Sequence, residues 1–536
     1  MRNLLLTMMA LGVMQTWTQE VSAAPDVAAT AQCSALASAE FSNIQDAPTQ
    51  VTEAKLIAAS GSVPALCQVQ GYVTPNVGFS LQLPASNWNG KFFERGCGGS
   101  CGRTESMGCN GTVQKGYACL ISDMGHRGIG LDGLWASNNL QAQVDFGYRG
   151  AHVVALAGKA IAERYYGRAP KHSYFLGCST GGRQALVEAQ RFPWDFDGII
   201  AGGLWIDDTA STMDELWAVR ALKYKDGKAI LSHANLQLVH DAALAKCDLD
   251  DGIRDGIIGN PLACKFDPAD LVCRAGQQSE CLTKVQADAV KKVYAGPMNS
   301  KGDKFFVGGA MPGSELAWEG LLLSTAPPAF GLPGSKSVVE IWATEYFRYM
   351  IMPPLGPDWK LTDFDFDRDY KRLGATSESL LNAGNPDLRK FKAAGGKLIA
   401  YQGWNDPLGA IPEKTVDYYE TVEKTLGGRA ETQEFFRLFM VPGMDHCTGG
   451  DGAFAIDYLG YLEGWVERGE APDRLIGAHI DGVSDARPYV TFPLNPAQHV
   501  KFTRPVFPYP IQAKYRGAGD PNRAENFVPV EAKSGR

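Results

Sequence analysis

The sequence has no long run of one charge sign. It holds 51 lysine and arginine residues against 59 aspartate and glutamate residues, which gives a formal net charge of -8. Proteins that bind nucleic acid usually present a clustered basic face to the phosphates. The charge pattern therefore argues against nucleic acid as a partner and indicates an ordinary solvated, acidic surface.

Apolar runs of membrane length are also missing. Near the N-terminus Arg2 precedes a short apolar run, Leu4 to Val13, and Val21-Ser22-Ala23 resembles a cleavage site. This is the pattern of a secretory signal peptide, and the run is too short to span a bilayer comfortably. We expect residues 1–23 to be removed on export, which leaves a soluble protein, secreted or periplasmic, without a membrane partner.

The chain lacks internal repeats and low-complexity segments. Its composition is that of a globular protein, with 45% hydrophobic and 21% charged residues. A length of 536 residues exceeds one ordinary domain. We therefore expect a large core domain together with an insertion or a second domain.

Cysteine, in contrast, is plentiful. Twelve cysteines fit an exported protein, because disulfides persist in an oxidising compartment. The even number permits complete pairing, although spacing alone leaves the pairing open. Zinc is the alternative for Cys97, Cys101, Cys109 and Cys119, but no histidine lies among these four, so disulfides are favoured.

Two regions alternate short apolar strands with helical patterns. The first extends from about Asn89 to Gly203, and the second begins near Gly396. Such alternation indicates an α/β protein with a parallel sheet and helices on both faces. The stretch from about Trp205 to Pro386 breaks this pattern with loops rich in proline and glycine. We interpret it as an insertion between two halves of one sheet, whose strands would pair across it.

The motif Gly177-Cys178-Ser179-Thr180-Gly181 matches G-x-S-x-G. It follows a predicted strand, Ser173 to Leu176, and precedes a helical stretch that starts near Gly182. A sharp turn in this context exposes the serine oxygen beside the helix N-terminus, whose backbone N–H groups stabilise a developing oxyanion. We predict that Ser179 is a nucleophile; the alternative is a structural glycine turn with an incidental serine.

A serine nucleophile needs a base, and in the α/β-hydrolase fold the chain order is serine, acid, histidine. Among eight histidines, His446 follows a predicted strand and the turn Pro442-Gly443. His479 and His499 also lie late in the chain but follow no comparable signal. We predict that His446 is the general base of Ser179; the alternative is an ordinary core or surface histidine.

The acid of the triad should also follow a strand. Asp406 comes after a predicted strand that ends at Tyr401, and it lies between the serine and the histidine in order. Asp445 is adjacent to His446 in sequence and is badly placed to accept from its ring. We predict Asp406; the alternative is an aspartate that only stabilises the turn before Pro407.

A glycine-rich loop, Gly96 to Gly102, follows the first predicted strand of this region. Loops of this kind turn a backbone N–H into the oxyanion site of esterases. We predict Gly98 as one donor, with Cys97 and Gly99 as alternatives, and the N–H of Thr180 as the other. Phosphate binding is disfavoured because no G-K-[ST] follows.

Two cysteines flank the predicted catalytic residues. Cys178 precedes Ser179, and Cys447 follows His446. If the serine and the histidine form a hydrogen bond, these cysteines must lie close together. A Cys178–Cys447 disulfide would hold the two loops in alignment.

Four aspartates and two glycines crowd the segment Asp248 to Gly256. It is not an EF-hand loop, because no glutamate occupies the twelfth position. Closely spaced carboxylates repel one another unless a cation neutralises them, and Ca²⁺ suits flexible oxygen ligands. The segment predicts a structural calcium site; a solvated acidic turn is the alternative.

Several of these stretches together resemble the tannase and feruloyl esterase family, which also includes the bacterial hydrolase of mono-hydroxyethyl terephthalate. The resemblance covers nearly all of the mature chain. It rests on Gly177 to Gln184, Arg191 to Gly198, Cys247 to Gly256, Tyr346 to Tyr349, Gly403 to Pro407 and Pro442 to Cys447.

The resemblance implies an α/β-hydrolase fold with a large inserted lid domain. Residues 24–204 and 387–536 would form the catalytic domain, with Ser179, Asp406 and His446 as its triad. Residues 205–386 would form the lid and carry the calcium site. The implied calcium ligands are the side chains of Asp248, Asp251 and Asp255 and the backbone oxygens of Ile253 and Ile257. The implied disulfides are Cys178–Cys447, Cys33–Cys67, Cys247–Cys264 and Cys273–Cys281.

The resemblance also implies a serine esterase that acts on small esters of aromatic acids, such as hydroxycinnamates or gallates. Trp342, Phe347 and Arg348 are candidates for its acyl pocket, and packing inside the lid is the alternative for each. A terephthalate half-ester or another xenobiotic ester is the alternative substrate. An exported calcium-dependent binding protein with an inactive triad is the non-enzyme alternative. The sequence does not indicate an oligomeric state.

The chain departs from the family pattern at two places. Members often carry a cysteine near each end of the C-terminal tail, where this chain has Phe507 and Pro529. The four cysteines between Cys97 and Cys119 are extra. Because they surround the predicted oxyanion loop, we expect them to stiffen the acyl pocket and to alter the preferred substrate.

Overall fold

The computed structural model describes residues 27–324, 336–351, 353–409, 411–481 and 499–532. The predicted signal peptide, residues 1–23, lies outside them. Within the described residues no helix is both long and apolar enough to cross a membrane.

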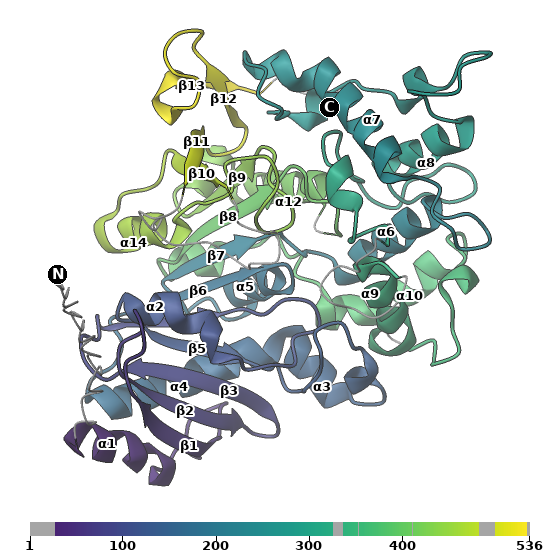
Figure 1. The fold of residues 1–536 in the computed structure, drawn as a ribbon. Coiled ribbons are helices and arrows are strands. Elements are labelled where there is room, and N and C mark those ends of the chain that lie inside the picture. Colours follow the sequence, from purple (N-terminus) through teal and green to yellow (C-terminus); the bar gives the residue numbers. More distant parts are fainter. Residues whose placement is uncertain (1–26, 325–335, 352, 410, 482–498, 533–536) are drawn as a thin grey trace, which may run out of the picture.

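The centre of the molecule is a mixed sheet of nine strands in the described residues, in the order β1-β2-β3-β5-β4-β6-β7-β8-β9 (Figure 1). The strands from β5 onward in this order run parallel, as predicted. The first three are antiparallel and were not predicted. The bounds are β1 (Thr49–Ile57), β2 (Leu66–Val73), β3 (Val77–Pro84), β4 (Lys91–Arg95), β5 (Ala118–Ser122), β6 (His172–Cys178), β7 (Gly198–Gly202), β8 (Lys397–Gly403) and β9 (Phe436–Val441).

Two small hairpins of the C-terminal region lie outside this sheet. Their strands are β10 (Leu475–Ile480), β11 (Val500–Val506), β12 (Ile511–Tyr515) and β13 (Phe527–Glu531). The helices are α1 (Val27–Ser34), α2 (Asn110–Gln114), α3 (Leu140–Val144), α4 (Gly150–Tyr166), α5 (Thr180–Arg191), α6 (Asp208–Ala221), α7 (His233–Cys247), α8 (Lys284–Ala295), α9 (Val338–Glu345), α10 (Asp369–Leu381), α11 (Arg389–Ala393), α12 (Pro412–Leu426), α13 (Arg429–Gln433) and α14 (Tyr458–Arg468).

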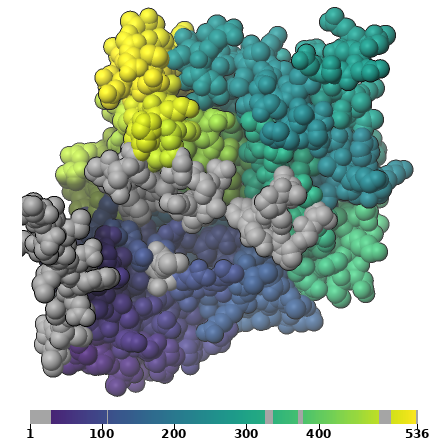
Figure 2. All heavy atoms as spheres, viewed as in Figure 1, coloured from purple at the N-terminus to yellow at the C-terminus, as the bar shows by residue number. Residues whose placement is uncertain are grey.

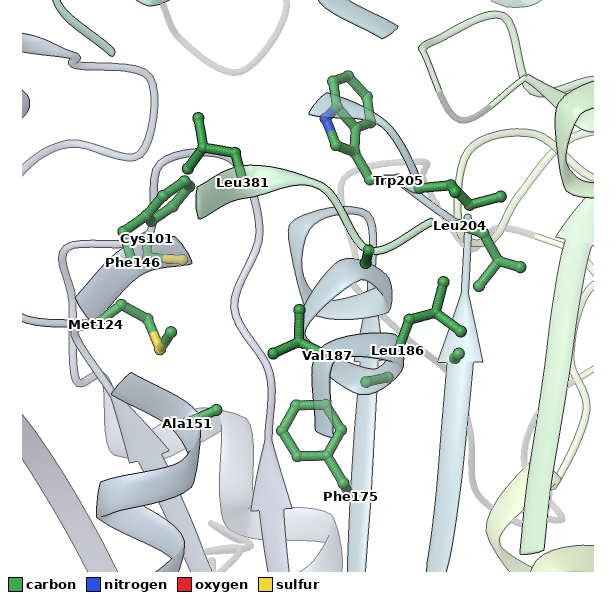
Figure 3. Close-up of a cluster of buried hydrophobic side chains, with 14 of the residues drawn as sticks. Cys101, Met124, Phe146, Ala151, Phe175, Leu186, Val187, Leu204, Trp205 and Leu381 are labelled. Atoms are coloured by element: carbon green, nitrogen blue, oxygen red, sulfur yellow. The ribbon is translucent and has the colours of Figure 1, made fainter. Parts of the chain in front are cut away.

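Most positions of the parallel strands are buried because both faces of the sheet are covered. In β6, Phe175 points to one face and belongs to the cluster that includes α4 and α5, whereas Tyr174 and Leu176 belong to the cluster on the α14 side. Figure 3 shows Phe175 beside Leu186 and Val187 of α5. This alternation of burial is the period-2 geometry of a strand that lies between two helical layers.

The inserted segment (residues 205–386) leaves the sheet after β7 and returns before β8. These two strands pair directly, with Gly198 opposite Lys397 and Gly202 opposite Tyr401. Helices α6 to α10 of the inserted segment gather on one side of the molecule (Figure 1). The α/β-hydrolase fold with a large insertion, predicted from the sequence, is therefore present.

Candidate active site

The predicted nucleophile lies at the sharp turn between β6 and α5. Ser179 has φ 64° and ψ -124°, a backbone conformation that non-glycine residues rarely adopt. Its N–H donates to Gly202 O at 3.0 Å. A side chain at Gly177 would lie only 2.4 Å from Gly181 O, so the turn requires glycine there. The motif residues thus hold the serine at the end of the strand and at the first turn of the helix.

His446 is oriented by a buried carboxylate. Its Nδ1 lies 2.8 Å from Asp406 Oδ2, and Asp406 is 1% exposed. The same carboxylate accepts the side-chain amide of Gln402 at 2.9 Å and the backbone N–H of Leu408 at 3.0 Å. These bonds fix the carboxylate in place. An imidazole that donates from Nδ1 keeps Nε2 as its basic atom, the arrangement a general base requires.

The serine and the histidine meet at one cavity, although 267 positions separate them in sequence. Both line a cavity of about 630 Å³. A Cβ atom built on Gly203 would lie 3.4 Å from both Ser179 N and His446 Cε1. The neighbouring Cys178 and Cys447 form a disulfide with 5.9 Å between their Cα atoms. The structure therefore brings Ser179, Asp406 and His446 together.

The glycine-rich loop borders the same cavity through Gly98 and Gly99, next to Thr180 at the start of α5, whose Oγ1 donates to Gly99 O at 2.7 Å. The N–H of Cys97 donates to Gln184 Oε1 at 3.2 Å, which occupies that donor. Gly99 has φ +57°, and a side chain there would lie 2.1 Å from Gly130 O. Gly98 and Gly99 thus remain the loop's candidates for the oxyanion site, beside the N–H of Thr180.

Part of the cavity wall is aromatic. Trp205 and Trp342 line it, and their rings meet edge to face with centroids 6.1 Å apart. The indole N–H of Trp342 donates to Thr212 Oγ1 at 3.3 Å. In Figure 3 the ring of Trp205 projects from the segment after β7, away from α5. Trp342 was a candidate pocket residue from the sequence, whereas Trp205 was missed although it lies three positions after the end of the central strand β7.

Comparison with known proteins identifies the family. The model of the family described as tannase and feruloyl esterase matches residues 61–530. The chain belongs to this family. The membership makes the protein a carboxylic ester hydrolase.

Individual relatives span most of the chain. An uncharacterized esterase of Xanthomonas campestris pv. campestris is 32% identical, over 100% of this chain and 96% of the relative. The mono(2-hydroxyethyl) terephthalate hydrolase of Piscinibacter sakaiensis is 33% identical, over 88% of this chain and 86% of the relative. The crystal structure of feruloyl esterase B from Aspergillus oryzae superposes with a TM-score of 0.79 at 27% identity, over 94% of this chain and 100% of that one.

All twelve cysteines of this family member are paired. Among the pairs are the four bridges that the family resemblance implies. The four extra cysteines form two local bridges, Cys97–Cys101 and Cys109–Cys119. Because their sulfur atoms are bonded to one another, the zinc alternative does not hold.

Two residues expected at the acyl pocket lie elsewhere. Phe347 is fully buried and packs against Trp359 and Phe364, with ring centroids 5.2 and 5.1 Å away. Arg348 donates from Nε to Trp359 O at 2.9 Å and lies 3.8 Å from Glu345. Neither side chain lines the cavity. Both instead pack within the inserted segment, which was the alternative for each. Phe347 lies five positions after Trp342, in the π-helical turn Tyr346–Met350 that follows α9, so its side chain does not share the direction of Trp342.

The acidic loop lies where the inserted segment meets the C-terminal hairpins, seen in Figure 2 as yellow against teal atoms. The carboxylate of Asp248 accepts the N–H groups of Asp255 at 3.3 Å and Gly256 at 3.1 Å. Asp255 Oδ2 pairs with Arg504 at 2.6 Å, while its buried Oδ1 has no hydrogen-bond partner among the described residues. Burial and the nearby carboxylates raise the pKa of Asp251 to about 7.

This donor set fits a hard cation in charge and chemistry. The guanidinium of Arg504 lies near two of these carboxylates, Asp251 and Asp255, and one oxygen of Asp255 has no hydrogen-bond partner among the described residues. The carbonyl groups of Ile253 and Ile257 belong to the same loop. The carboxylate oxygens of Asp248, Asp251 and Asp255 do not all lie within 4.8 Å of one another, however. In the described residues, the metal-type donors that converge within 4.8 Å are those of His152, Glu188 and Asp195.

Proposed function

We propose that the protein hydrolyses esters of aromatic acids, such as hydroxycinnamoyl or galloyl esters, through an acyl-enzyme on Ser179. The observation that carries the proposal is the 2.8 Å contact between His446 Nδ1 and the buried Asp406, at the cavity that Ser179 also lines. Ester hydrolysis needs an activated hydroxyl beside a space large enough for the acyl group, and this cavity offers both.

The reaction follows from these positions. His446 Nε2 takes the proton of Ser179 Oγ as that oxygen bonds to the ester carbonyl carbon. The backbone N–H groups of Thr180 and Gly98 stabilise the oxyanion, and Asp406 stabilises the imidazolium. His446 then returns the proton to the departing alcohol. Water, activated by the same imidazole, adds to the acyl-enzyme, releases the aromatic acid and restores the serine.

The wall of the cavity supports an aromatic acyl group. Trp205 and Trp342 present two large apolar rings to the space beside Ser179. Aromatic rings prefer offset or edge-to-face contact with other rings, so a benzoyl or cinnamoyl group gains more here than an aliphatic one. A terephthalate half-ester is the second candidate substrate, favoured by the similarity to the Piscinibacter sakaiensis hydrolase.

Substitutions of Ser179 and His446, with a second histidine as the control, test the assignment of the catalytic residues. We expect Ser179→Ala and His446→Gln to lower kcat/KM on methyl ferulate and methyl gallate by roughly a thousandfold or more. His479→Gln, at a late histidine that instead contacts Gly452 O, should leave turnover within about twofold. Full activity of Ser179→Ala, or no labelling of Ser179 by a fluorophosphonate, would rule out the mechanism and favour a binding protein.

We further propose a structural Ca²⁺ at Asp248, Asp251 and Asp255, with the backbone oxygens of Ile253 and Ile257. The unsatisfied oxygen of Asp255 and the raised pKa of Asp251 support it. A bound cation would stabilise the contact between the inserted segment and the C-terminal hairpins. Asp250 on the same loop is exposed and provides a matched control.

The calcium proposal is tested by metal content and thermal stability. We expect the purified protein to hold one Ca²⁺ per chain and to lose several degrees of Tm in a chelator, with recovery on adding Ca²⁺. Asp251→Asn should weaken binding, while Asp250→Asn should behave like the unmodified protein. A chain with no bound Ca²⁺ and a Tm indifferent to the chelator would reject the site.

We also propose that the protein is exported, with residues 1–23 removed. Six disulfides in the described structure support an oxidising compartment. The mature protein recovered from the producing cell should begin near Ala24, as N-terminal sequencing would show. An intact N-terminus and reduced cysteines would contradict export.

A further inference from the structure

The glycine-rich loop (Gly96–Gly102) packs directly against the turn that carries the nucleophile. A Cβ atom built on Gly96 would lie only 3.0 Å from Gly181 Cα, and one built on Gly181 would lie 2.9 Å from Cys97 O. No side chain fits between the two backbones at this point. The position of the loop relative to Ser179 therefore depends on its contacts with the first turns of α5.

Most backbone N–H groups of this loop already have acceptors inside the protein. Those with an acceptor belong to Gly96, Cys97, Ser100, Cys101 and Gly102. The N–H groups of Gly98 and Gly99 have none among the described residues, and both glycines line the cavity together with Ser179. The internal hydrogen bonds of the loop thus leave available the N–H groups that an oxyanion in the cavity would need.

Gln184, in the second turn of α5, joins the helix to this loop. It is 3% exposed and does not line the cavity. Its Oε1 accepts the N–H of Cys97 at 3.2 Å, while its Nε2 lies 3.0 Å from Cys97 Sγ and 3.7 Å from Cys101 Sγ. One amide therefore contacts both the backbone and the disulfide of the loop, immediately before Gly98.

Thr180 provides a second contact, on the other side of Gly98. Its Oγ1 donates to Gly99 O at 2.7 Å. The backbone of Gly98 is therefore held on both sides by side chains of the helix that follows Ser179. Oxyanion donors are effective when they lie about 2.7–3.1 Å from the developing charge, so contacts that fix this backbone bear directly on the rate.

We propose that Gln184 is a positioning residue of the oxyanion site, which aligns the Gly98 N–H with Ser179 by holding the Cys97–Cys101 bridge against α5. This inference rests on the ester hydrolysis proposed above. The oxyanion forms only in the transition state, so a displaced donor slows the chemical step and leaves the binding of the ester itself largely unchanged.

A substitution of Gln184 tests this role through the separate effects on kcat and KM. Gln184→Met keeps the length of the side chain and removes both amide contacts. We expect kcat on methyl ferulate to fall about tenfold, with KM within about twofold. The loss is smaller than the hundredfold or more expected for deleting an oxyanion donor, roughly, because Thr180 still holds Gly99.

Gln190 offers a matched control on the same helix. Its amide donates to Ala383 O at 2.6 Å and to Tyr418 OH at 3.0 Å instead of to the loop. Gln190→Met removes comparable hydrogen bonds from α5, and kcat should stay within about twofold of the unmodified protein. A comparison of the two variants separates a general weakening of the helix from a displacement of the loop.

A tetrahedral adduct reports on the oxyanion site without turnover. The trifluoromethyl ketone analogue of ferulate bonds through its carbonyl carbon to Ser179 Oγ, whose proton passes to His446, and carries the oxyanion. We expect Gln184→Met to bind this ketone about tenfold more weakly, in step with its loss of kcat/KM. The binding of ferulic acid, which forms no adduct, should change by no more than about twofold.

The contribution of the bridge is tested by combining variants. Cys97→Ala with Cys101→Ala removes the disulfide that the amide contacts. In this background Gln184→Met should lower kcat by a further threefold or less, approximately, because the two changes disturb the same alignment. A full further tenfold loss would show that the residues act independently.

The other outcomes are also distinguishable. An unchanged kcat in Gln184→Met, an equal loss in Gln190→Met, or an unchanged affinity for the ketone would overturn the positioning role. No hydrolysis of methyl ferulate or methyl gallate by the unmodified protein, together with no fluorophosphonate labelling of Ser179, would instead reject the proposed ester hydrolysis itself.

Discussion

The two sides of the cavity are held by disulfides that close chain segments of very different length. On the side of the nucleophile, Cys178–Cys447 joins positions 269 residues apart. On the side of the glycine-rich loop, Cys97–Cys101 joins positions four residues apart. The first bridge ties together two halves of the sheet that the inserted segment separates in sequence. The second shapes one turn of backbone that is already local.

The comparison separates two ways in which a bridge can serve a site. A long-range bridge greatly restricts the unfolded chain, and by the chain-entropy model closing 269 residues contributes about 6 kcal/mol to stability. A bridge of four residues contributes only about 2 kcal/mol by the same argument. If the short bridge matters, its effect must appear in the geometry of the loop N–H groups rather than in stability.

Removal of the long bridge should have the largest effect. We expect Cys178→Ala combined with Cys447→Ala to lower the free energy of unfolding by about 6 kcal/mol and kcat by about a hundredfold, because the serine and histidine loops lose their common support. Urea unfolding and steady-state kinetics measure the two effects. Cys33→Ala with Cys67→Ala, a bridge remote from the cavity, should cost about 4 kcal/mol without a loss of kcat. Equal kcat losses in both double variants would contradict the alignment role.

The second prediction concerns acid stability beneath the glycine-rich loop. His126 Nε2 donates to Ser100 O at 2.6 Å, and the ring stacks on Trp135. Burial lowers the pKa of His126 to about 4, whereas an unfolded histidine titrates near pH 6.5. The unfolded state thus binds the proton first, so stability is complete above pH 6.5 and falls by about 3 kcal/mol as the pH drops to 4.

Variants at histidines of contrasting burial test this titration. His126→Phe keeps the stacked ring and should flatten the fall in unfolding free energy between pH 6.5 and pH 4. His499→Gln, at an exposed histidine, should leave the fall unchanged. An unaltered pH profile in His126→Phe would show that other groups control the acid sensitivity.

The smallest loss of stability is expected for the short bridge. Cys97→Ala combined with Cys101→Ala should cost about 2 kcal/mol, yet lower kcat about tenfold with little change in KM, because only the oxyanion geometry relaxes. Cys273→Ala with Cys281→Ala, a short bridge of the inserted segment, should cost a similar amount and leave kcat unchanged. If kcat is unchanged in the variant without Cys97–Cys101, this bridge contributes only to stability.

The site elements that sequence predicted are those with a local signature. The turn around Ser179 needs glycines between a strand and a helix, and Asp406 and His446 each follow a strand in the expected order. Thr180 and Gly98 follow from the same two loops. Local chemistry therefore suffices for these residues, and the fold only has to bring the strand ends to one edge.

Residues whose role depends on orientation were harder to predict. Gln184 follows the motif that carries Ser179, but only the packed structure shows that its amide contacts the glycine-rich loop. Phe347 and Arg348 belong to a recognisable stretch, but their place in the chain does not specify which way they point. The strand β3 escaped prediction because it carries buried polar residues, Ser80 and Gln82, that conceal its apolar character.

The pairing of β7 with β8 has a consequence for the way this chain folds. The edge of β7, Gly198–Gly202, is completed only by Lys397–Gly403, almost two hundred positions later. During synthesis the nascent sheet therefore carries an open apolar border until the polypeptide has passed through the whole inserted segment. Such a border attracts strands of other molecules. The demand for chaperones during synthesis should consequently peak while residues 205–396 emerge.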